Sequence, residues 1–171
     1  MAIDVLIIGS GSLAEAILFS LVTLEAGRLN LAIAARDQER LNWLHHAASA
    51  QAFSVNHNHI VHARLLTHCD AANVASVLQD LRPAIVLNVA SLQSAWTLGG
   101  QDGWSRFVSR HGYGVTAPLQ LVLALEIAKA IQTTFPSTLY VNAAYPDVVN
   151  PLLLQLGYPV CCGLGNVAIL A

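Results

Sequence analysis

Short hydrophobic runs alternate with longer amphipathic stretches along most of the chain. The hydrophobic runs predict strands over residues 4–9, 29–35, 60–66, 84–90, 138–143 and 159–162. The stretches between them predict helices over residues 13–26, 37–48, 71–81, 116–134 and 147–156. This alternation is typical of an α/β protein with a doubly wound, mostly parallel sheet and helices on both faces. No linker interrupts the series, so we predict one domain over residues 1–171.

The first predicted strand ends in closely spaced glycines that lead directly into a helix, in the pattern G-x-G-x-x-A. Such a turn aims the free N–H groups of the helix at a diphosphate, and glycine has no Cβ to block the approach. The pattern predicts a Rossmann-type dinucleotide site; the alternative is a glycine turn that joins strand to helix without a ligand. The residues predicted to bind the cofactor here are Gly9, Ser10, Gly11, Ser12, Leu13 and Ala14.

The end of the second predicted strand bears on which dinucleotide binds. Residues 29–35 are apolar and are followed by Arg36 and Asp37, with no acidic residue at the last strand position. An acidic residue there binds the ribose of NAD, whereas a nearby arginine accommodates the 2′-phosphate of NADP. Arg36 and Arg40 therefore favour NADP over NAD. The alternative is that both arginines lie on an ordinary solvated helix face. Asp37 is a rival ribose ligand, but it suits the N-cap of the next helix better.

Residues 91–113 have no clear periodicity and follow the fourth predicted strand, on the side where open α/β sheets bind ligands. We predict a partly helical loop on the substrate side; the alternative is a surface whose aromatic residues pack against a partner. Ala90 and Ser91, at the start of this segment, are predicted to contact the cofactor. His111 has suitable acid–base chemistry, and its alternative is a solvated loop histidine.

Two further polar residues lie at strand ends. Asn142 ends the fifth predicted strand, where its carboxamide is expected to face the cleft and to bind a nicotinamide or a substrate oxygen. Asp70 follows the third predicted strand, where it either contacts the adenine or caps the helix that begins at Ala71, and capping is favoured. The dipeptide Pro146-Asp147 is typical of a helix start.

The order of these motifs, from the glycine turn through the Val141-Asn142 strand end to residues 163–166, resembles the nucleotide-binding half of the lactate/malate dehydrogenase type. The resemblance implies that Asn142 lies beside the nicotinamide carboxamide or the substrate, and that Arg106 lies in a mobile loop that meets the substrate. It also implies a catalytic histidine in a substrate domain beyond this chain. The glycine turn and residues 31–41 are similar to NADP-binding domains of the saccharopine dehydrogenase type.

Composition narrows the classes of function. Hydrophobic residues make up 55% of the chain and charged residues 11%, with a net charge of −2. The chain has no basic stripe to neutralise phosphates, so we expect no nucleic-acid partner. Residues 148–171 have no charge, but prolines and glycines interrupt them, so we expect buried strands rather than a membrane span. The apolar residues 166–171 predict a covering partner, either a further domain or a second copy in a homo-oligomer.

The remaining candidates complete the prediction. His57 and His59 share one side of an extended segment, but no cysteine or carboxylate supports them as metal ligands, so we predict no metal site. We predict a cytoplasmic NADP-dependent oxidoreductase domain that transfers a hydride to or from a small carbonyl, imine or hydroxy substrate. His111 and Arg106 are its catalytic candidates. The alternatives are a non-catalytic NAD(P)-sensing or oligomerisation module, and a domain that binds another nucleotide such as a nucleotide sugar.

Overall fold

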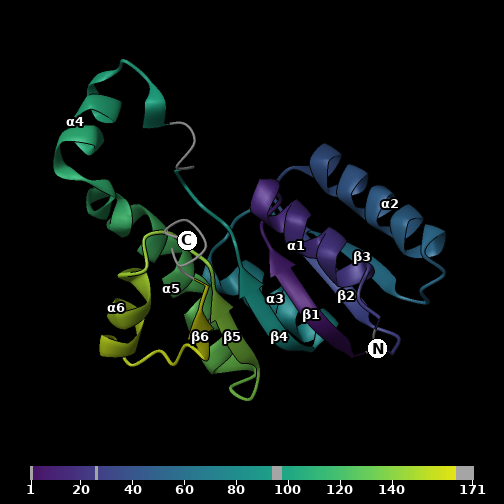
Figure 1. Cartoon of the computed structure of the whole chain (residues 1–171). Coiled ribbons are helices and arrows are strands. Elements are labelled where there is room, and N and C mark those ends of the chain that lie inside the picture. Colours follow the sequence, from purple (N-terminus) through teal and green to yellow (C-terminus); the bar gives the residue numbers. More distant parts are fainter. Residues whose placement is uncertain (1, 26, 94–97, 165–171) are drawn as a thin grey trace.

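The computed structural model describes residues 2–25, 27–93 and 98–164. Its centre is a six-stranded parallel sheet with the strand order β3-β2-β1-β4-β5-β6 (Figure 1). The order reverses between β1 and β4, which are paired with each other in parallel. The strands are β1 (Ile3–Ile8), β2 (Asn30–Ala35), β3 (Ile60–Leu65), β4 (Pro83–Asn88), β5 (Leu139–Asn142) and β6 (Cys162–Gly163).

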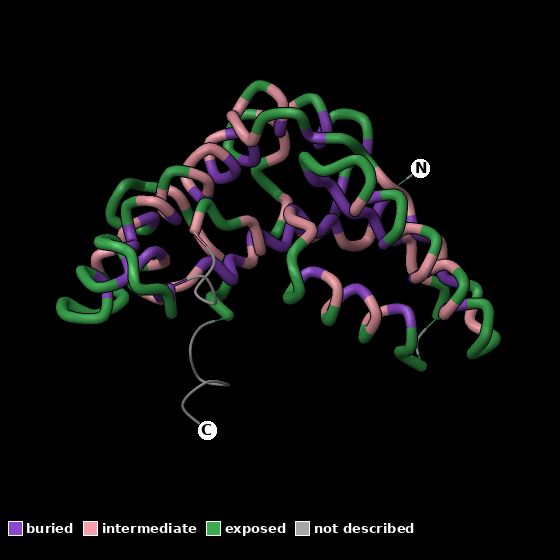
Figure 2. The backbone as a smooth tube through the Cα atoms, turned by 90° about the horizontal axis from the view of Figure 1, so that it is seen from above, coloured by how far each residue is buried: buried purple, intermediate pink, exposed green. Residues whose placement is uncertain are grey.

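Helices cover both faces of the sheet, as the alternating pattern predicts (Figures 1 and 2). Ile7 on β1 packs with the buried side chains of α1 and α2, while its neighbours Leu6 and Ile8 pack with those of α3 and α5. Strand residues covered on both faces explain why the strands are continuous hydrophobic runs. The helices are α1 (Ser12–Val22), α2 (Gln38–Ser54), α3 (Ala71–Leu81), α4 (Gly103–His111), η2 (Tyr113–Thr116, a 3₁₀ helix), α5 (Ala117–Thr134) and α6 (Val149–Gln155).

The segment predicted as a partly helical loop contains α4, which extends away from the sheet (Figure 1). Asp102 caps this helix by accepting from the N–H of Ser105 at 2.9 Å and from its hydroxyl at 2.5 Å. These hydrogen bonds hold the pKa of Asp102 below its usual value. Trp96, an aromatic residue of the same segment, lies outside the described residues.

Three element ends differ from the prediction by three residues or more, and α6 begins at Val149, two residues after the predicted start at Asp147. Helix α1 ends at Val22 rather than at residue 26, because Val22 is its last buried residue and residues 23–25 are exposed, so no further side chain holds the helix on the sheet. Helix α2 continues to Ser54, and Asn56 with its positive φ follows it. Strand β6 begins at Cys162 instead of residue 159, since only the last two residues of β5 face it.

One helical segment of the described chain, Tyr113–Thr134, is long and apolar enough to cross a membrane, with half of its most apolar window buried inside the protein. Its α5 part packs against α3 and against the sheet. This is the position of a core helix, which passes the same test of length and composition.

Candidate functional site

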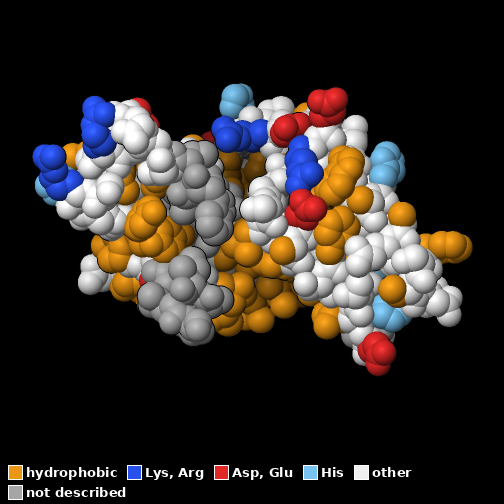
Figure 3. All heavy atoms as spheres, turned by 45° about the horizontal axis from the view of Figure 1, so that its top comes forward, with side chains coloured by type: hydrophobic (Ala, Val, Ile, Leu, Met, Phe, Trp, Pro, Cys, Tyr) orange, Lys and Arg blue, Asp and Glu red, His pale blue; other side chains and the backbone are white. Residues whose placement is uncertain are grey.

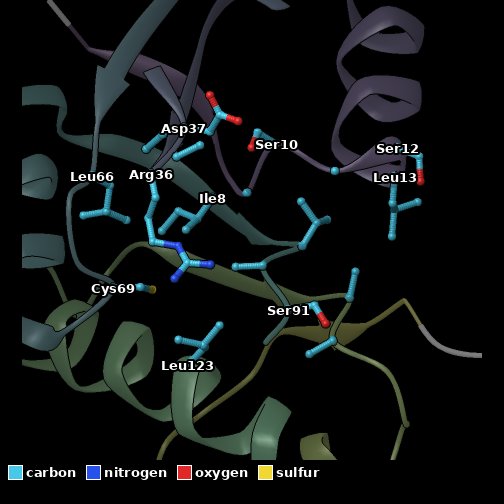
Figure 4. Close-up of a pocket in the computed structure, with 18 of the residues that line it drawn as sticks. Ile8, Ser10, Ser12, Leu13, Arg36, Asp37, Leu66, Cys69, Ser91 and Leu123 are labelled. Atoms are coloured by element: carbon cyan, nitrogen blue, oxygen red, sulfur yellow. The ribbon is translucent and has the colours of Figure 1, made fainter. Parts of the chain in front are cut away.

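A cavity of about 830 Å³ opens at the carboxyl ends of the strands, where the strand order reverses (Figure 4). This is the crevice in which open α/β sheets bind ligands. In the space-filling view it is a hollow with hydrophobic side chains at its base (Figure 3). Its lining residues are Ile8, Gly9, Ser10, Gly11, Ser12, Leu13, Ala34, Ala35, Arg36, Asp37, Leu66, Cys69, Val89, Ala90, Ser91, Gln93, Leu123, Ala143, Ala144 and Tyr145.

The glycine turn forms one wall of this cavity. Gly9 has φ +129°, and a Cβ there would lie 3.0 Å from backbone atoms of Val89 and Ala90. Gly11 precedes α1 and has open space where a Cβ would lie; at this N-terminus no side-chain hydrogen bond caps the helix within the described chain. The first N–H groups of α1 are therefore available to an anion, as the pattern predicts.

Ala14, the third small position of the motif, does not line the cavity. It is fully buried among the side chains that join α1 to the sheet. A small residue there allows close packing of helix against strand, which is the packing role of that position in the motif.

Arg36 lies in the cavity, and its side chain extends from the end of β2 past Ile8 toward Cys69 (Figure 4). Asp37 points away from that guanidinium and caps α2 by accepting from the N–H of Arg40 at 2.9 Å. The capping role of Asp37 is therefore confirmed. Arg36 is the cation that the end of β2 presents to a ligand.

Arg40 was expected beside the cofactor, but it does not line the cavity. Its guanidinium donates to the carbonyl of Ser10 at 3.2 Å, forms an ion pair with Glu15, and lies 4.5 Å from the centre of the Trp43 ring. One helical turn after Asp37, the side chain points back toward α1 rather than into the cavity. Arg40 thus ties α2 to the glycine turn and to α1.

The opposite wall comes from the turns after β4 and β5. Ser91 Oγ donates to the carbonyl of Gln93 at 2.6 Å, and the buried Gln120 of α5 donates to the same carbonyl at 2.9 Å. Trp104 Nε1 donates to Gln93 Oε1 at 3.2 Å, which links α4 to the cavity rim. Ala90 and Ser91 therefore lie where the sequence predicts them, within a wall that α5 holds in place.

Two predicted contacts lie elsewhere. Asn142 is 0% exposed and is hydrogen-bonded to Asn88 and Asn150, so its carboxamide does not face the cavity. Asp70 caps α3 by accepting from the N–H of Asn73 at 2.9 Å, which lowers the pKa of Asp70. The capping alternative for Asp70 is confirmed. Both side chains bond protein groups, and neither residue lines the cavity.

The catalytic candidates Arg106 and His111 lie on α4 and do not line the cavity. Arg106 donates to the carbonyl of Gln101, and the His111 ring lies 4.6 Å from the Phe107 ring. The structure therefore does not bring them together with the glycine turn. Within residues 2–25, 27–93 and 98–164, no group of three His, Cys, Asp or Glu side chains is placed to hold a metal.

Several lining residues were not identified from the sequence. Leu66 and Cys69 follow β3, Leu123 comes from α5, and Tyr145 follows β5. Burial raises the pKa of the Cys69 thiol to about 11, so the thiol is neutral at physiological pH. Most of these side chains are small or apolar. A position at or just after a strand end is the signal for Leu66, Cys69 and Tyr145, whereas Leu123 lies inside a predicted helix and carries no such signal.

Comparison with known proteins identifies the fold. No family model matches the chain, and no curated protein matches its sequence. The solved structures that it resembles include malate dehydrogenase from Picrophilus torridus, with a TM-score of 0.69 and 12% identity over 97% of this chain and 46% of that one. The chain has the Rossmann fold.

Two other structures of this fold extend the comparison. Lactate dehydrogenase from Eimeria maxima with NADH and oxamate has a TM-score of 0.64 and 14% identity, over 96% of this chain and 44% of that one. A short-chain type dehydrogenase/reductase from Mycobacterium ulcerans has a TM-score of 0.61 and 11% identity, over 91% and 61%. This Rossmann domain spans less than half of the lactate and malate dehydrogenases. The resemblance to their fold is confirmed, and that to the saccharopine dehydrogenase type stays a prediction.

Proposed function

We propose that this Rossmann domain binds a nicotinamide dinucleotide across the cavity and is the cofactor-binding part of an oxidoreductase. The observation that carries the proposal is the cavity itself, which runs from Arg36 past the uncapped start of α1 to Ser91. A Rossmann sheet binds one mononucleotide half on each side of the strand-order reversal. The adenosine half then lies toward β2 and β3, and the nicotinamide half toward β4 and β5.

Each wall has a separate task in this proposal. The N–H groups at the start of α1 hold the diphosphate, because they carry the positive end of the helix dipole. Leu66 and Leu123 provide apolar surface for the adenine, and Ala143 and Ala144 exclude water at the other end. The bound cofactor supplies the hydride chemistry for a small carbonyl, imine or hydroxy substrate. Cys69 is unsuited as the general base, because its thiol stays protonated at physiological pH.

We further propose that the preferred cofactor is NADP. Arg36 supports this preference, since it is a cation inside the cavity at the end of β2. Arg40 gives it no support, because its guanidinium is already paired with Glu15. The Eimeria maxima enzyme, by contrast, is described with NADH. The preference for NADP therefore rests on Arg36 alone.

The alternative is a non-catalytic module that senses NAD(P) and changes its assembly. One observation favours it: of the acid–base side chains that line the cavity in the described chain, Asp37 caps α2 and the Cys69 thiol stays protonated, which leaves Tyr145. A module predicts binding without turnover, whereas the oxidoreductase predicts that the complete protein oxidises NADPH with a carbonyl or imine. In either case we propose a cytoplasmic protein that is covered by a second copy or by a further domain. Residues 166–171, which suggest this covering partner, lie outside the described residues, and Leu154 and Leu164 are apolar residues that the described chain exposes.

The test is a calorimetric titration of the purified chain with NADPH and with NADH, alongside intrinsic tryptophan fluorescence. Trp104 is a suitable reporter because it bonds Gln93 at the cavity rim. Tighter binding of NADPH supports both proposals, and tighter binding of NADH supports only the first. If neither dinucleotide binds, the dinucleotide proposal is wrong, and binding of a nucleotide sugar becomes the hypothesis to test.

A further inference from the structure

Three asparagine side chains are hydrogen-bonded in series where β4 and β5 end. Asn88 Nδ2 donates to Asn142 Oδ1 at 2.8 Å, and Asn142 Nδ2 donates to Asn150 Oδ1 at 2.6 Å. Asn88 and Asn142 lie opposite each other in the pairing of β4 with β5, and both are 0% exposed. We refer to these three side chains as the carboxamide chain.

The backbone fixes the direction of the carboxamide chain. The N–H of Ala90 donates to Asn88 Oδ1 at 3.0 Å. Because a backbone N–H can only donate, the oxygen of Asn88 must face Ala90, and its NH₂ group must face Asn142. Asn142 then accepts with its oxygen and donates onward to Asn150. Each of the three amides therefore has one orientation that satisfies its neighbours.

The carboxamide chain holds backbone groups that line the cavity. The N–H of Ala90 donates to Asn88 Oδ1 and the N–H of Ala144 to Asn142 Oδ1 at 3.4 Å; beside them, a backbone hydrogen bond joins the N–H of Ala143 to the main-chain carbonyl of Asn88 at 2.8 Å. Ala90, Ala143 and Ala144 are all lining residues. The two buried asparagines thus connect the turn after β4 with the turn after β5, and these turns form one wall of the cavity.

Stability alone does not account for two buried carboxamides at this place. A buried amide costs free energy unless it is fully hydrogen-bonded, and covered parallel strands are usually hydrophobic. Strand β4 follows that rule up to Leu87. An apolar pair would fill the space after Leu87, but it would leave the N–H of Ala90 without its acceptor. What the asparagines add is hydrogen bonds that fix the backbone of the two turns at Ala90 and Ala144.

We infer that Asn88 and Asn142 are positioning residues for the nicotinamide half of the dinucleotide. The inference rests on the function proposed above, in which this half lies toward β4 and β5. Neither side chain touches the ligand, because both are closed off from the cavity; they act through Ala90 and Ala144. This differs from the direct contact with nicotinamide or substrate that the sequence implies for Asn142.

The test compares a whole cofactor with its adenosine half. Wild type, Asn88→Ala and Asn142→Ala are titrated with NADPH and with adenosine 2′,5′-bisphosphate, or with NADH and AMP if the wild type prefers NADH. We expect each variant to lose about tenfold or more in NADPH affinity, the effect of about one buried hydrogen bond. The affinity for the bisphosphate should change less than about twofold, because its proposed contacts are on the β1–β2 side.

The matched control is Thr138→Val. Thr138 Oγ1 donates to the carbonyl of Pro83 at 2.9 Å, so it ties β5 to β4 at the opposite end of the same strands. This variant should bind both ligands as the wild type does. A milder variant, Asn150→Ala, removes only the last acceptor of the series and should lower NADPH affinity by about threefold. It decides the question if the buried variants do not fold.

A measurement without ligand separates this inference from the proposed function. Amide hydrogen exchange at Ala90 and Ala144 should be faster in Asn142→Ala than in wild type, and unchanged in Thr138→Val. Unchanged exchange, or an equal loss of both ligands in a folded variant, overturns the inference. A wild-type chain that binds neither ligand contradicts the proposed function instead, and exchange at the two alanines then decides whether the carboxamide chain holds the wall.

Discussion

Gly9 and Gly11 are two residues apart, yet the structure gives them different reasons to be glycine. Gly9 adopts φ +129°, and a Cβ would press on the backbone after β4, whereas Gly11 has open space. We expect Gly9→Ala to lower the free energy of unfolding by about 1–3 kcal/mol. Gly11→Ala should change it by less than about 0.5 kcal/mol but weaken dinucleotide binding about tenfold, because the new methyl group occupies the approach of the phosphates. Urea unfolding and calorimetric titration measure the two effects; equal destabilisation by both substitutions would contradict the assignment.

Substitutions of the two arginines after β2 should have different effects on cofactor affinity. Arg36 lies in the cavity with its cation facing the ligand side, so Arg36→Ala should weaken NADPH binding about tenfold to a hundredfold and change NADH binding by less than about threefold. Arg40 holds the Ser10 carbonyl and Glu15, so Arg40→Ala should weaken both dinucleotides by a similar factor. Titration of both variants with both cofactors measures the four affinities. If Arg40→Ala discriminates between the cofactors and Arg36→Ala does not, the roles are reversed.

The sequence identifies well those site residues that are placed by the backbone alone, at the end of a strand. The glycine turn and Arg36 follow from their places at strand ends, and both line the cavity. Asn142 and Arg40 also occupy the expected elements, but their side chains bond protein groups instead. Those partners, Asn88 and Glu15, are distant in sequence. Pattern reasoning places a side chain on an element, but it does not reveal which partner satisfies that side chain.

At the scale of elements, acid should loosen α4 before it unfolds the sheet. Asp102 caps this helix, and hydrogen bonds from Ser105 lower its pKa. A carboxylate with a lowered folded-state pKa contributes stability above its unfolded pKa of about 3.9, and this contribution is lost as the pH falls through the folded value. We therefore expect the amide protection factors in α4, that is, exchange rates relative to the intrinsic rate at each pH, to fall below about pH 4. In Asp102→Asn this pH dependence of α4 should be absent. Helix α3, which Asp70 caps, should keep its own pH dependence in the same variant. An α4 pH dependence that is the same in the variant as in wild type would contradict the capping role.

Strands and long helices could be predicted from the sequence within a few residues, because both faces of the sheet are covered and the hydrophobic runs are strong. Helix α4 is the exception. Trp104, Phe107 and Val108 have the spacing of one apolar helix face, but the helix has only nine residues, begins at Gly103 and is followed by Gly112, so its periodic signal is short. The end of α1 was missed because the apolar residue Leu24 extends the hydrophobic pattern, although in the structure it is exposed and does not pack on the sheet.

At the scale of the molecule, the two halves of the sheet meet through the pairing of β1 with β4, directly under the cavity. A dinucleotide that binds there contacts both halves. Because it binds the folded chain and not the unfolded chain, it stabilises the fold by mass action. At 100 times its dissociation constant we expect about 2.7 kcal/mol, which for a domain of this size raises the melting temperature by about 5–11 °C. Each further tenfold in concentration should add about 1.4 kcal/mol.

Scanning calorimetry of wild type and Gly11→Ala over a range of NADPH concentrations measures this stabilisation. Both proteins should melt together without ligand, because Gly11 has open space around it. With NADPH the wild-type melting temperature should rise with the logarithm of concentration, and the variant should need about ten times more ligand for the same rise. Identical curves would mean that the ligand stabilises the chain away from the glycine turn. A wild-type melting temperature that neither NADPH nor NADH changes would leave the turn as a structural element and the cavity without its proposed cofactor.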